Sequence, residues 1–297
     1  MARNRIPKPR LACEITAQGV IAARAKSDGS RLDVHTWRKL ERDLVRPSLA
    51  PGNIADPGTL TQTIESALSA VGGRKRDVVA VLPDAAIRVL LLDFDSLPEK
   101  VAEAEPIIRF RLRKSVPFDA DHAALSFQSY RKEAAVRVLA AVCPREVLTE
   151  YESVIRGAGY EPGIVVPSTL AALSAIEAQR PTLLVTVDAN YISIAIAQGN
   201  EIVFYRTLDV LPRRSGTDIA NEVYPSIVFF EDNYSARIEQ IFLISSSPDE
   251  ELAQALEEQT GIRPESLDSG IDVGESLSGN GIPKSALAGI AGVLTRS

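Results

Sequence analysis

The chain has 297 residues and a formal net charge of −6; 45% of its residues are hydrophobic but only 5% are aromatic. This length suits one large domain or two ordinary ones with an aliphatic core. The acidic balance argues against nucleic-acid binding by the whole protein, and no apolar run reaches the ~20 residues of a membrane span. The basic start leads into a short strand rather than an apolar signal segment, so we expect a cytoplasmic protein.

Cysteine and histidine are too sparse to build a site. Cys13 and Cys143 lie in apolar, strand-like settings, which predicts reduced core thiols. His35 and His122 are far apart and have no cysteine or acid at ligand spacing. This excludes a zinc site and a histidine-based triad.

The first third of the chain begins with turned strands. A strand ends near Glu14, a turn forms at residues 17–19, and a second strand follows. A turn at Asp28-Gly29 then precedes a third strand. After a loop rich in proline and glycine, the expected elements are a helix over 58–71 with Thr59 or Thr61 as its cap, and buried strands at 77–83 and 86–94.

The middle of the chain alternates helices and strands. A helical period covers residues 96–118, beginning near Asp95 or Ser96, and Pro106 predicts a kink or a break inside it. The elements expected next are strands at 123–131 and 135–144, a helix from Arg145 that ends at Gly157 or Gly159, and a strand that enters a helix at Pro167-Ser168.

The last third opens with "VTVDANYISIAIAQGNEIVFYRTL", residues 185–208. It reads as an apolar strand, a turn at residues 198–200 and a second strand, with Asp188 closing the first β-run where the chain bends. The elements expected after it are a helix over 217–235, a buried strand at 238–247, a helix at 248–262 that ends at Gly261, and a small-residue amphipathic helix at 283–296. A loop rich in glycine and serine precedes that last helix.

Residues 11–95 and 183–244 both begin with a turned hairpin. Two halves on one plan predict a duplicated α/β architecture with a cleft between them. Such a cleft commonly holds a nucleotide.

The order of several segments resembles the PilM family, the actin-like proteins of type IV pilus assembly. The segments are "AVLPDAAIRVLLLDFDSLP", "EAEPIIRFRLRKSVPFDADHAALSFQSY", "VRVLAAVCPREVLTEYESVIRGAGYEPGIVVPSTLAALSAI" and the 185–208 hairpin. The resemblance is good over residues 80–210 and loose at the ends. It implies an α/β actin-like fold, with ribonuclease H-like duplicated halves, an inserted α+β subdomain and a reduced second half. The implied domains are 1–95, 96–165 and 166–297.

The same resemblance implies ATP with magnesium in the cleft, but the residues there depart from the family pattern. Where the first hairpin should read Asp-x-Gly-Ser, this chain has Glu14 to Gln18; where the second should read Asp-x-Gly, it has Asp188 to Asn190. Glycine is needed there because only it lets the backbone approach phosphate. A glycine pair expected after "IFLI", residues 241–244, is replaced by three serines and Pro248. Asn190 could still adopt the left-handed conformation.

Two interpretations of these residues remain open. Glu14, Gln18, Asp188 and Asn190 could hold Mg-ATP, or the acids could end hairpins and accept hydrogen bonds from turn N–H groups. We favour the second, in which the site is vestigial, no cofactor is needed, and no residue is catalytic. The alternative is an ATPase of the same fold.

The implied partner is the N-terminal tail of an inner-membrane PilN-like protein, held in a groove beside the inserted subdomain. The residues assigned to this contact are Arg109, Arg111, Arg113, Val116, Pro117 and Phe118. The alternating cations could instead form a solvated helix face. The predicted function is a cytoplasmic adaptor of pilus assembly at the inner face of the inner membrane; a component of type II secretion is a related alternative.

Overall fold

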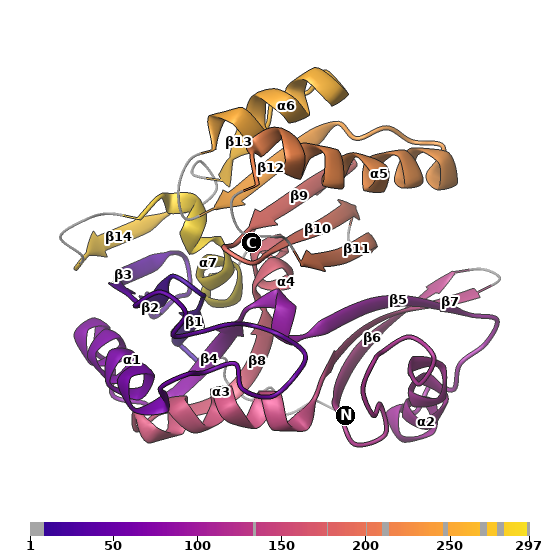
Figure 1. Ribbon diagram of the computed structural model, residues 1–297. Coiled ribbons are helices and arrows are strands. Elements are labelled where there is room, and N and C mark those ends of the chain that lie inside the picture. Colours follow the sequence, from indigo (N-terminus) through magenta and orange to yellow (C-terminus); the bar gives the residue numbers. More distant parts are fainter. Residues whose placement is uncertain are drawn as a thin grey trace.

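The computed structural model describes residues 9–132, 135–176, 178–199, 201–209, 214–245, 249–267, 272–277 and 282–295. Three sheets organise these residues, and two of them share one plan. Figure 1 shows the first sheet in the lower left lobe, the second in the upper lobe, and the small third sheet at the lower right.

The first sheet has the strand order β14-β3-β2-β1-β4-β8. Its strands are β1 (Leu11–Ile15), β2 (Gly19–Ala25), β3 (Leu32–Lys39), β4 (Asp77–Leu82), β8 (Glu161–Pro167) and β14 (Val273–Ser276). β1, β2 and β3 form an antiparallel meander, whereas β4 lies parallel to β1 and β8 parallel to β4. Continuous burial along β1 and β4 explains why these strands are apolar without alternation.

The second sheet repeats this plan with the order β11-β10-β9-β12-β13. Its strands are β9 (Thr182–Val187), β10 (Tyr191–Gln198), β11 (Glu201–Asp209), β12 (Gln240–Ser245) and β13 (Glu265–Ser266). Again three strands form an antiparallel meander and the next two are parallel. The predicted duplication of the α/β halves is therefore confirmed by topology.

Helices cover both large sheets. α1 (Pro57–Val71) and α3 (Arg145–Gly157) bury their apolar stripes with one face of the first sheet, and α4 (Ser168–Leu173) and α7 (Ala288–Leu294) with the other. α5 (Gly216–Tyr234) and α6 (Glu250–Thr260) pack on the second sheet. Short 3-10 turns, η1 (Asp84–Ala86) and η3 (Lys284–Leu287), follow β4 and precede α7.

The third sheet has the order β5-β7-β6 and carries one helix. β5 (Arg88–Phe94), β6 (Ala124–Lys132) and β7 (Ala135–Cys143) are antiparallel, and α2 (Val101–Leu112) covers one face through Ala104, Ile108 and Leu112. The sheet therefore spans residues 88 to 143, while β8 belongs to the first sheet. The division at residues 95 and 165 stays a prediction.

Three local predictions need correction. α2 begins at Val101 rather than near Ser96, and it runs through Pro106 without a break. The cap of α1 is Asp56, whose carboxylate accepts hydrogen bonds from the amides of Gly58 and Thr59, so neither predicted threonine caps it.

Other local predictions are confirmed. Gly159 has a φ of 82° just after α3, and Gly261 has a φ of 74° at the end of α6, the conformation typical of helix ends. Cys13 and Cys143 are free and buried. The tip beyond Lys132, the turn residue Asn200 and most of the loop rich in glycine and serine lie outside the described residues.

The C-terminal segment returns to the first half. α7 is buried at every residue, so it is a core helix and not the amphipathic helix that the sequence predicts. Its small residues permit this contact: a Cβ on Gly292 would collide with the Ala171 carbonyl oxygen of α4. β14 likewise pairs with β3. Both elements tie the end of the chain to its beginning.

Candidate functional site

The cleft between the two halves gathers several of the predicted site residues around one small cavity. Its volume is about 50 Å³, and Glu14, Gln18 and Asp188 line it together with Tyr191 and Ser168. Asn190 is not among the lining residues, and its φ is not positive. The left-handed turn considered for Asn190 therefore does not form.

The first hairpin turn satisfies its own backbone. The Thr16 hydroxyl accepts hydrogen bonds from the amides of Gln18 (3.2 Å) and Gly19 (3.0 Å), and the Thr16 amide donates to the Gly19 carbonyl. Such a hydroxyl-centred turn needs no glycine at the first positions. Two N–H groups that a phosphate would need are thus already bonded.

The second turn is closed in a similar way. The Asp188 amide donates to the Tyr191 carbonyl at 3.0 Å, and its carboxylate accepts a hydrogen bond from the Ala189 amide. Burial raises the pKa of Asp188, with Asp84 as a further negative neighbour. The Asp188 carboxylate therefore accepts a hydrogen bond from the backbone of the turn in which it lies.

Glu14 is the most isolated acid in the cleft. Its Oε1 accepts a hydrogen bond from the Ser168 hydroxyl at 2.5 Å, whereas Oε2 is buried and has no partner among the described residues. Desolvation by burial, together with the negative neighbours Asp84 and Asp188, raises the pKa of Glu14 to about 8. Glu14 is consequently protonated at neutral pH.

Asp84 is the central acid of the cleft, and our reading of the sequence missed it. Its side chain is fully buried and accepts hydrogen bonds from the Thr169 amide (3.1 Å), the Thr169 hydroxyl (2.7 Å) and the Tyr205 hydroxyl (2.7 Å). Burial is the main cause of its raised pKa. The one local signal was an acid directly after a buried apolar strand.

The hydrogen bonds of Asp84 join both halves of the molecule. Asp84 follows β4 of the first sheet, Thr169 lies in the first turn of α4, and Tyr205 lies on β11 of the second sheet. The Asp84 amide also donates to the Tyr191 hydroxyl on β10. The polar groups of the cleft thus connect the two halves and form hydrogen bonds mainly with one another.

The described residues form no cluster of metal-binding side chains. Among the described residues there is no group of three or more histidines, cysteines or acids placed to hold a metal ion. Of the serine segment predicted to replace the glycine pair, Ser245 lines the cavity, and residues 246–248 lie outside the described residues.

The residues assigned to partner binding divide into two groups. Arg109 is mostly buried: its guanidinium donates to the carbonyls of Ala120 and Ala123 and pairs with Glu105. Val116 and Phe118 pack against the core of the third sheet. These three residues shape the segment before β6 and are not free to contact a partner through most of their surface.

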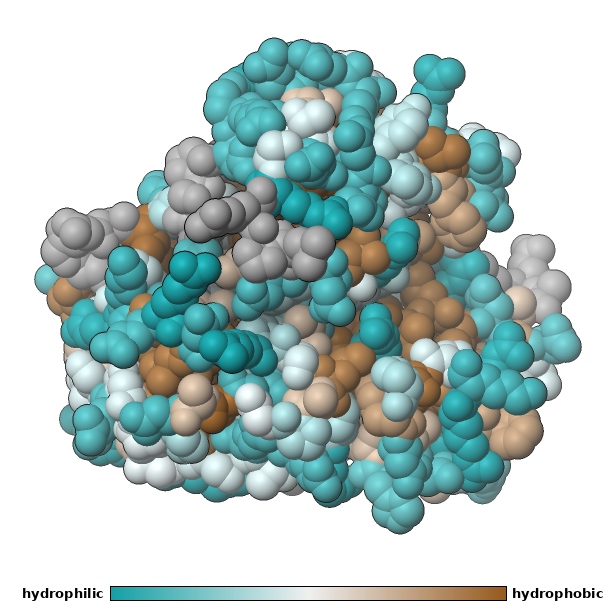
Figure 2. All heavy atoms as spheres, viewed as in Figure 1, coloured by the Kyte–Doolittle hydropathy of each residue, from teal (hydrophilic) through white to brown (hydrophobic). Residues whose placement is uncertain are grey.

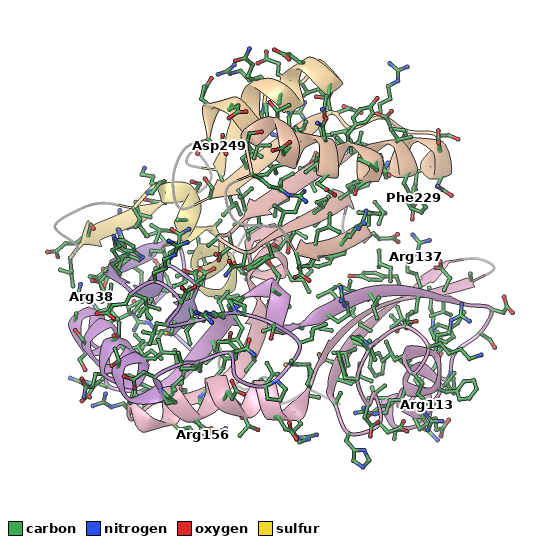
Figure 3. All side chains as sticks on the ribbon, viewed as in Figure 1. Arg38, Arg113, Arg137, Arg156, Phe229 and Asp249 are labelled. Carbon is green, nitrogen blue, oxygen red and sulfur yellow. The ribbon has the colours of Figure 1, made fainter. Side chains whose placement is uncertain are left out.

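Arg111, Arg113 and Pro117 are exposed. Arg113 pairs with Asp121 at 2.8 Å and lies over the Phe110 ring, whereas Arg111 has no side-chain partner among the described residues. Figure 3 shows Arg113 on the lower right lobe, beside α2.

Hydrophobic side chains gather in the recess between the upper lobe and the third sheet, as Figure 2 shows. One contact across this recess is polar: the Arg137 guanidinium on β7 donates to the Tyr234 hydroxyl of α5 at 2.7 Å and also pairs with Asp93. Figure 3 places Arg137 below α5, on the side of Phe229.

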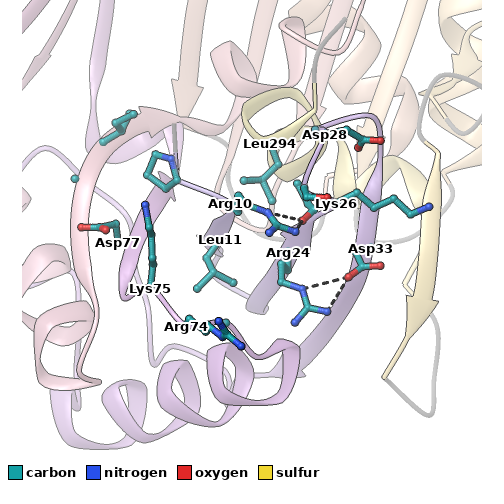
Figure 4. Close-up of a pocket in the computed structure, with 17 residues that line it drawn as sticks. Arg10, Leu11, Arg24, Lys26, Asp28, Asp33, Arg74, Lys75, Asp77 and Leu294 are labelled. Carbon is teal, nitrogen blue, oxygen red and sulfur yellow. Dashed lines mark hydrogen bonds and ion pairs between the residues drawn. The ribbon is translucent and has the colours of Figure 1, made fainter. Parts of the chain in front are cut away.

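A much larger cavity, about 1250 Å³, lies at the other end of the first sheet (Figure 4). Two of its cations are already bonded: Arg10 to the Ala25 carbonyl, and Arg24 to Asp33 and the Val71 carbonyl. Lys26, Arg74 and Lys75 also line it, beside three aspartates. The end of α1 at Val71 makes cations favourable here without any ligand.

No family model matches the chain, and no curated protein matches it. Solved structures do. A chain of the PilM–PilN type IV pilus biogenesis complex is 20% identical with a TM-score of 0.79, covering 96% of this chain and 98% of that one.

Two further structures are similar at lower identity. The cytoplasmic domain of EpsL, an inner-membrane component of the type II secretion system of Vibrio cholerae, is 10% identical with a TM-score of 0.54 (97% and 95% covered). A protein of unknown function with an actin-like ATPase fold from Bacteroides thetaiotaomicron is 9% identical with a TM-score of 0.55 (92% and 96% covered). The predicted fold is confirmed: this chain has the actin-like fold.

Proposed function

We propose that this chain is an adaptor of type IV pilus assembly that works without nucleotide. It would hold the N-terminal tail of an inner-membrane PilN-like protein at the cytoplasmic face of the inner membrane. The fold shared with the PilM–PilN complex supports the pilus setting, and the EpsL cytoplasmic domain makes type II secretion the related setting. No helix among the described residues is long and apolar enough to cross a membrane.

The observation that carries the nucleotide-free part is the size of the cleft cavity. Ligand pockets usually measure roughly 300–1,000 Å³, whereas this cavity holds about 50 Å³. Its acids and turn amides also bond to one another, so few groups remain for phosphate or magnesium.

Titration calorimetry of the purified protein with millimolar Mg-ATP tests this part first. We expect no binding heat and no thermal shift from protein that circular dichroism shows to be folded. One-to-one binding that Asp188→Ala abolishes would instead favour the ATPase alternative, with Glu14, Gln18, Asp188 and Asn190 as its site.

Docking of the tail is supported by the third sheet. β6 is at the edge of the sheet and pairs only with β7 among the described strands. An extended peptide can add to such an edge and gain backbone hydrogen bonds. Arg109 fixes the segment that leads into β6, and the exposed Arg111, Arg113 and Pro117 lie nearby in the chain.

Hydrogen exchange with a synthetic tail peptide tests this surface. The peptide is the N-terminal segment of a PilN-like inner-membrane protein. We expect slower exchange in β6 and unchanged exchange in α6, which serves as the internal control. Arg113→Glu should weaken binding, whereas Arg42→Glu, an exposed arginine of the first half, should not. Protection confined to another surface would contradict this docking site.

A further inference from the structure

Exposed large hydrophobic side chains concentrate on two helices. Of the eight such residues in the described part of the chain, six lie on α2 or α5. Singly scattered apolar residues are normal on a protein surface, but clusters mark interaction sites. The two clusters therefore need an explanation that goes beyond the proposed adaptor function.

The first cluster is named here the α2 stripe: Ile107, Phe110 and Arg111 on the outer face of α2, with Lys114 in the turn that follows the helix. Ile107 lies three residues before Phe110 and four before Arg111, which places these three on one side of the helix. Ile107 is 41% and Phe110 62% exposed, while the opposite side, with Ile108 and Leu112, is fully buried. Arg111 and Lys114 have no ion pair among the described residues.

The second cluster lies on α5 and is named here the α5 stripe: Tyr224, Val228, Phe229 and Asp232. The three apolar residues are 42%, 38% and 51% exposed. Phe229 is supported from below by Phe204 of β11, with ring centroids 5.6 Å apart. Figure 3 shows Phe229 on the upper lobe, whereas the α2 stripe belongs to the lower right lobe with Arg113.

The charges of the two stripes are opposite. Gly216–Tyr234 contains no lysine or arginine, and the acids Glu231 and Asp232 next to Phe229 have no side-chain partner among the described residues. The α2 stripe carries two unpaired cations instead. Pairing either stripe with itself would oppose like charges, whereas pairing one with the other brings opposite charges together around apolar side chains.

We propose that copies of this chain associate head to tail, with the α2 stripe of one copy packed on the α5 stripe of the next. Phe110 and Phe229 are the central apolar contacts, and Arg111 and Lys114 face Asp232 and Glu231. Because the two stripes are different surfaces of one chain, each copy keeps one free stripe of each kind. Such an interface either closes into a ring or extends as a chain of copies.

Sedimentation velocity tests the proposal on the full chain without nucleotide or tail peptide, so its failure leaves the adaptor proposal standing. From about 1 μM to about 1 mM, the range for weak interfaces, the mean mass should rise past that of a dimer. Wild-type protein that stays monomeric throughout, or stops at a dimer, would overturn the proposal.

Two variants each remove the central aromatic side chain of one of the two stripes. Phe110→Ser and Phe229→Ser should each raise the dissociation constant by about 30-fold, the loss typical of a central aromatic contact. A mixture of the two should form a one-to-one dimer and stop there, because only one intact pair of stripes exists. Val101→Ser is the matched control: Val101 is 64% exposed on α2 but lies outside the stripe. A mixture that stays monomeric would contradict the proposed interface. A Val101→Ser variant that associates as weakly as Phe110→Ser would contradict it as well.

Variants of the charged residues test the interface without changing its apolar contacts. Lys114→Glu and Asp232→Lys alter exposed residues and should leave folding intact while weakening association. A single chain that carries both changes restores opposite charges across the interface and should regain most of the wild-type affinity. If the double variant is instead as weak as both losses combined, the two residues do not face each other.

Discussion

The cleft and the outer face of α2 both carry ionisable side chains but use them in opposite ways. In the cleft, Glu14, Asp84 and Asp188 accept hydrogen bonds from neighbouring protein groups. At the end of α2 and in the turn after it, Arg111 and Lys114 face solvent without side-chain partners among the described residues. Acids that are hydrogen-bonded inside the fold stabilise one arrangement of the halves, whereas cations without partners remain available to another molecule.

The largest expected effect is the loss of stability when the hydrogen bonds of the cleft are removed. Asp84→Ala removes an acceptor shared by three buried donors on Thr169 and Tyr205. Because each buried donor left without a partner costs about 1–3 kcal/mol, we expect the free energy of unfolding to fall by about 4 kcal/mol. Urea unfolding measures this, and Asp84→Asn, which keeps one carbonyl acceptor, should lose less. A loss below that of the exposed control Asp93→Ala would contradict the central role of Asp84.

The pH dependence of stability should report the buried state of Glu14. Its pKa is about 8 in the folded protein against an ordinary 4.5, so the folded state keeps a proton that the unfolded state releases. Stability from this group is complete below about pH 4.5 and is lost as the pH rises through about 8. Between pH 6 and pH 8 this loss should reach about 2 kcal/mol.

Glu14→Gln isolates that contribution, since glutamine keeps the shape without titrating. Urea midpoints measured at several pH values should decline less steeply for the variant than for the wild type. Asp84 and Asp188 also have raised pKa values and are present in both proteins, so the difference between the two profiles reports Glu14. Parallel profiles would show that Glu14 is ionised in the folded protein.

A smaller effect should come from the helix behind the cleft. Gly292→Ala places a methyl group against the Ala171 carbonyl and forces α7 away from α4. Overpacking costs about 1–3 kcal/mol, and the better helix propensity of alanine offsets up to about 1 kcal/mol. We expect a net loss of about 1–2 kcal/mol in urea unfolding. Unchanged stability would mean that the two helices can separate without cost.

The smallest expected effect on stability comes from the exposed cations of the α2 stripe. Arg111→Glu and Lys114→Glu should change the free energy of unfolding by no more than about 0.5 kcal/mol, because exposed charges without partners contribute little to stability. Denaturant unfolding at concentrations too low for association provides the measurement. A larger change would show that these cations stabilise the fold itself.

Much of the fold followed from patterns within short segments. The first three-strand meander, the hairpin turn at Gly199, the buried strand β4 and the helix ends at Gly159 and Gly261 depend on neighbouring residues, and they lie where the sequence predicts them. The actin-like architecture followed from the order of such segments. Errors arose where a local signal competed with packing, as in the start of α2 and its passage through Pro106.

The candidate site was less predictable. Glu14, Gln18 and Asp188 line one cavity as the hairpin positions implied, but Asn190 does not. Asp84 was missed because its partners lie 85 and 121 residues away in the sequence. Arg109 looked like one more cation of an exposed series, although its guanidinium holds the backbone before β6.

The sequence by itself determined the elements, their order and the duplicated plan, because periodicity, turn residues and helix ends act over a few neighbouring positions. Only the tertiary structure decided which charges are committed to the fold and which are free. Burial and hydrogen bonding depend on groups brought together from distant parts of the chain: Asp84 with Thr169 and Tyr205, or Gly292 with Ala171. Local sequence patterns do not encode those distances.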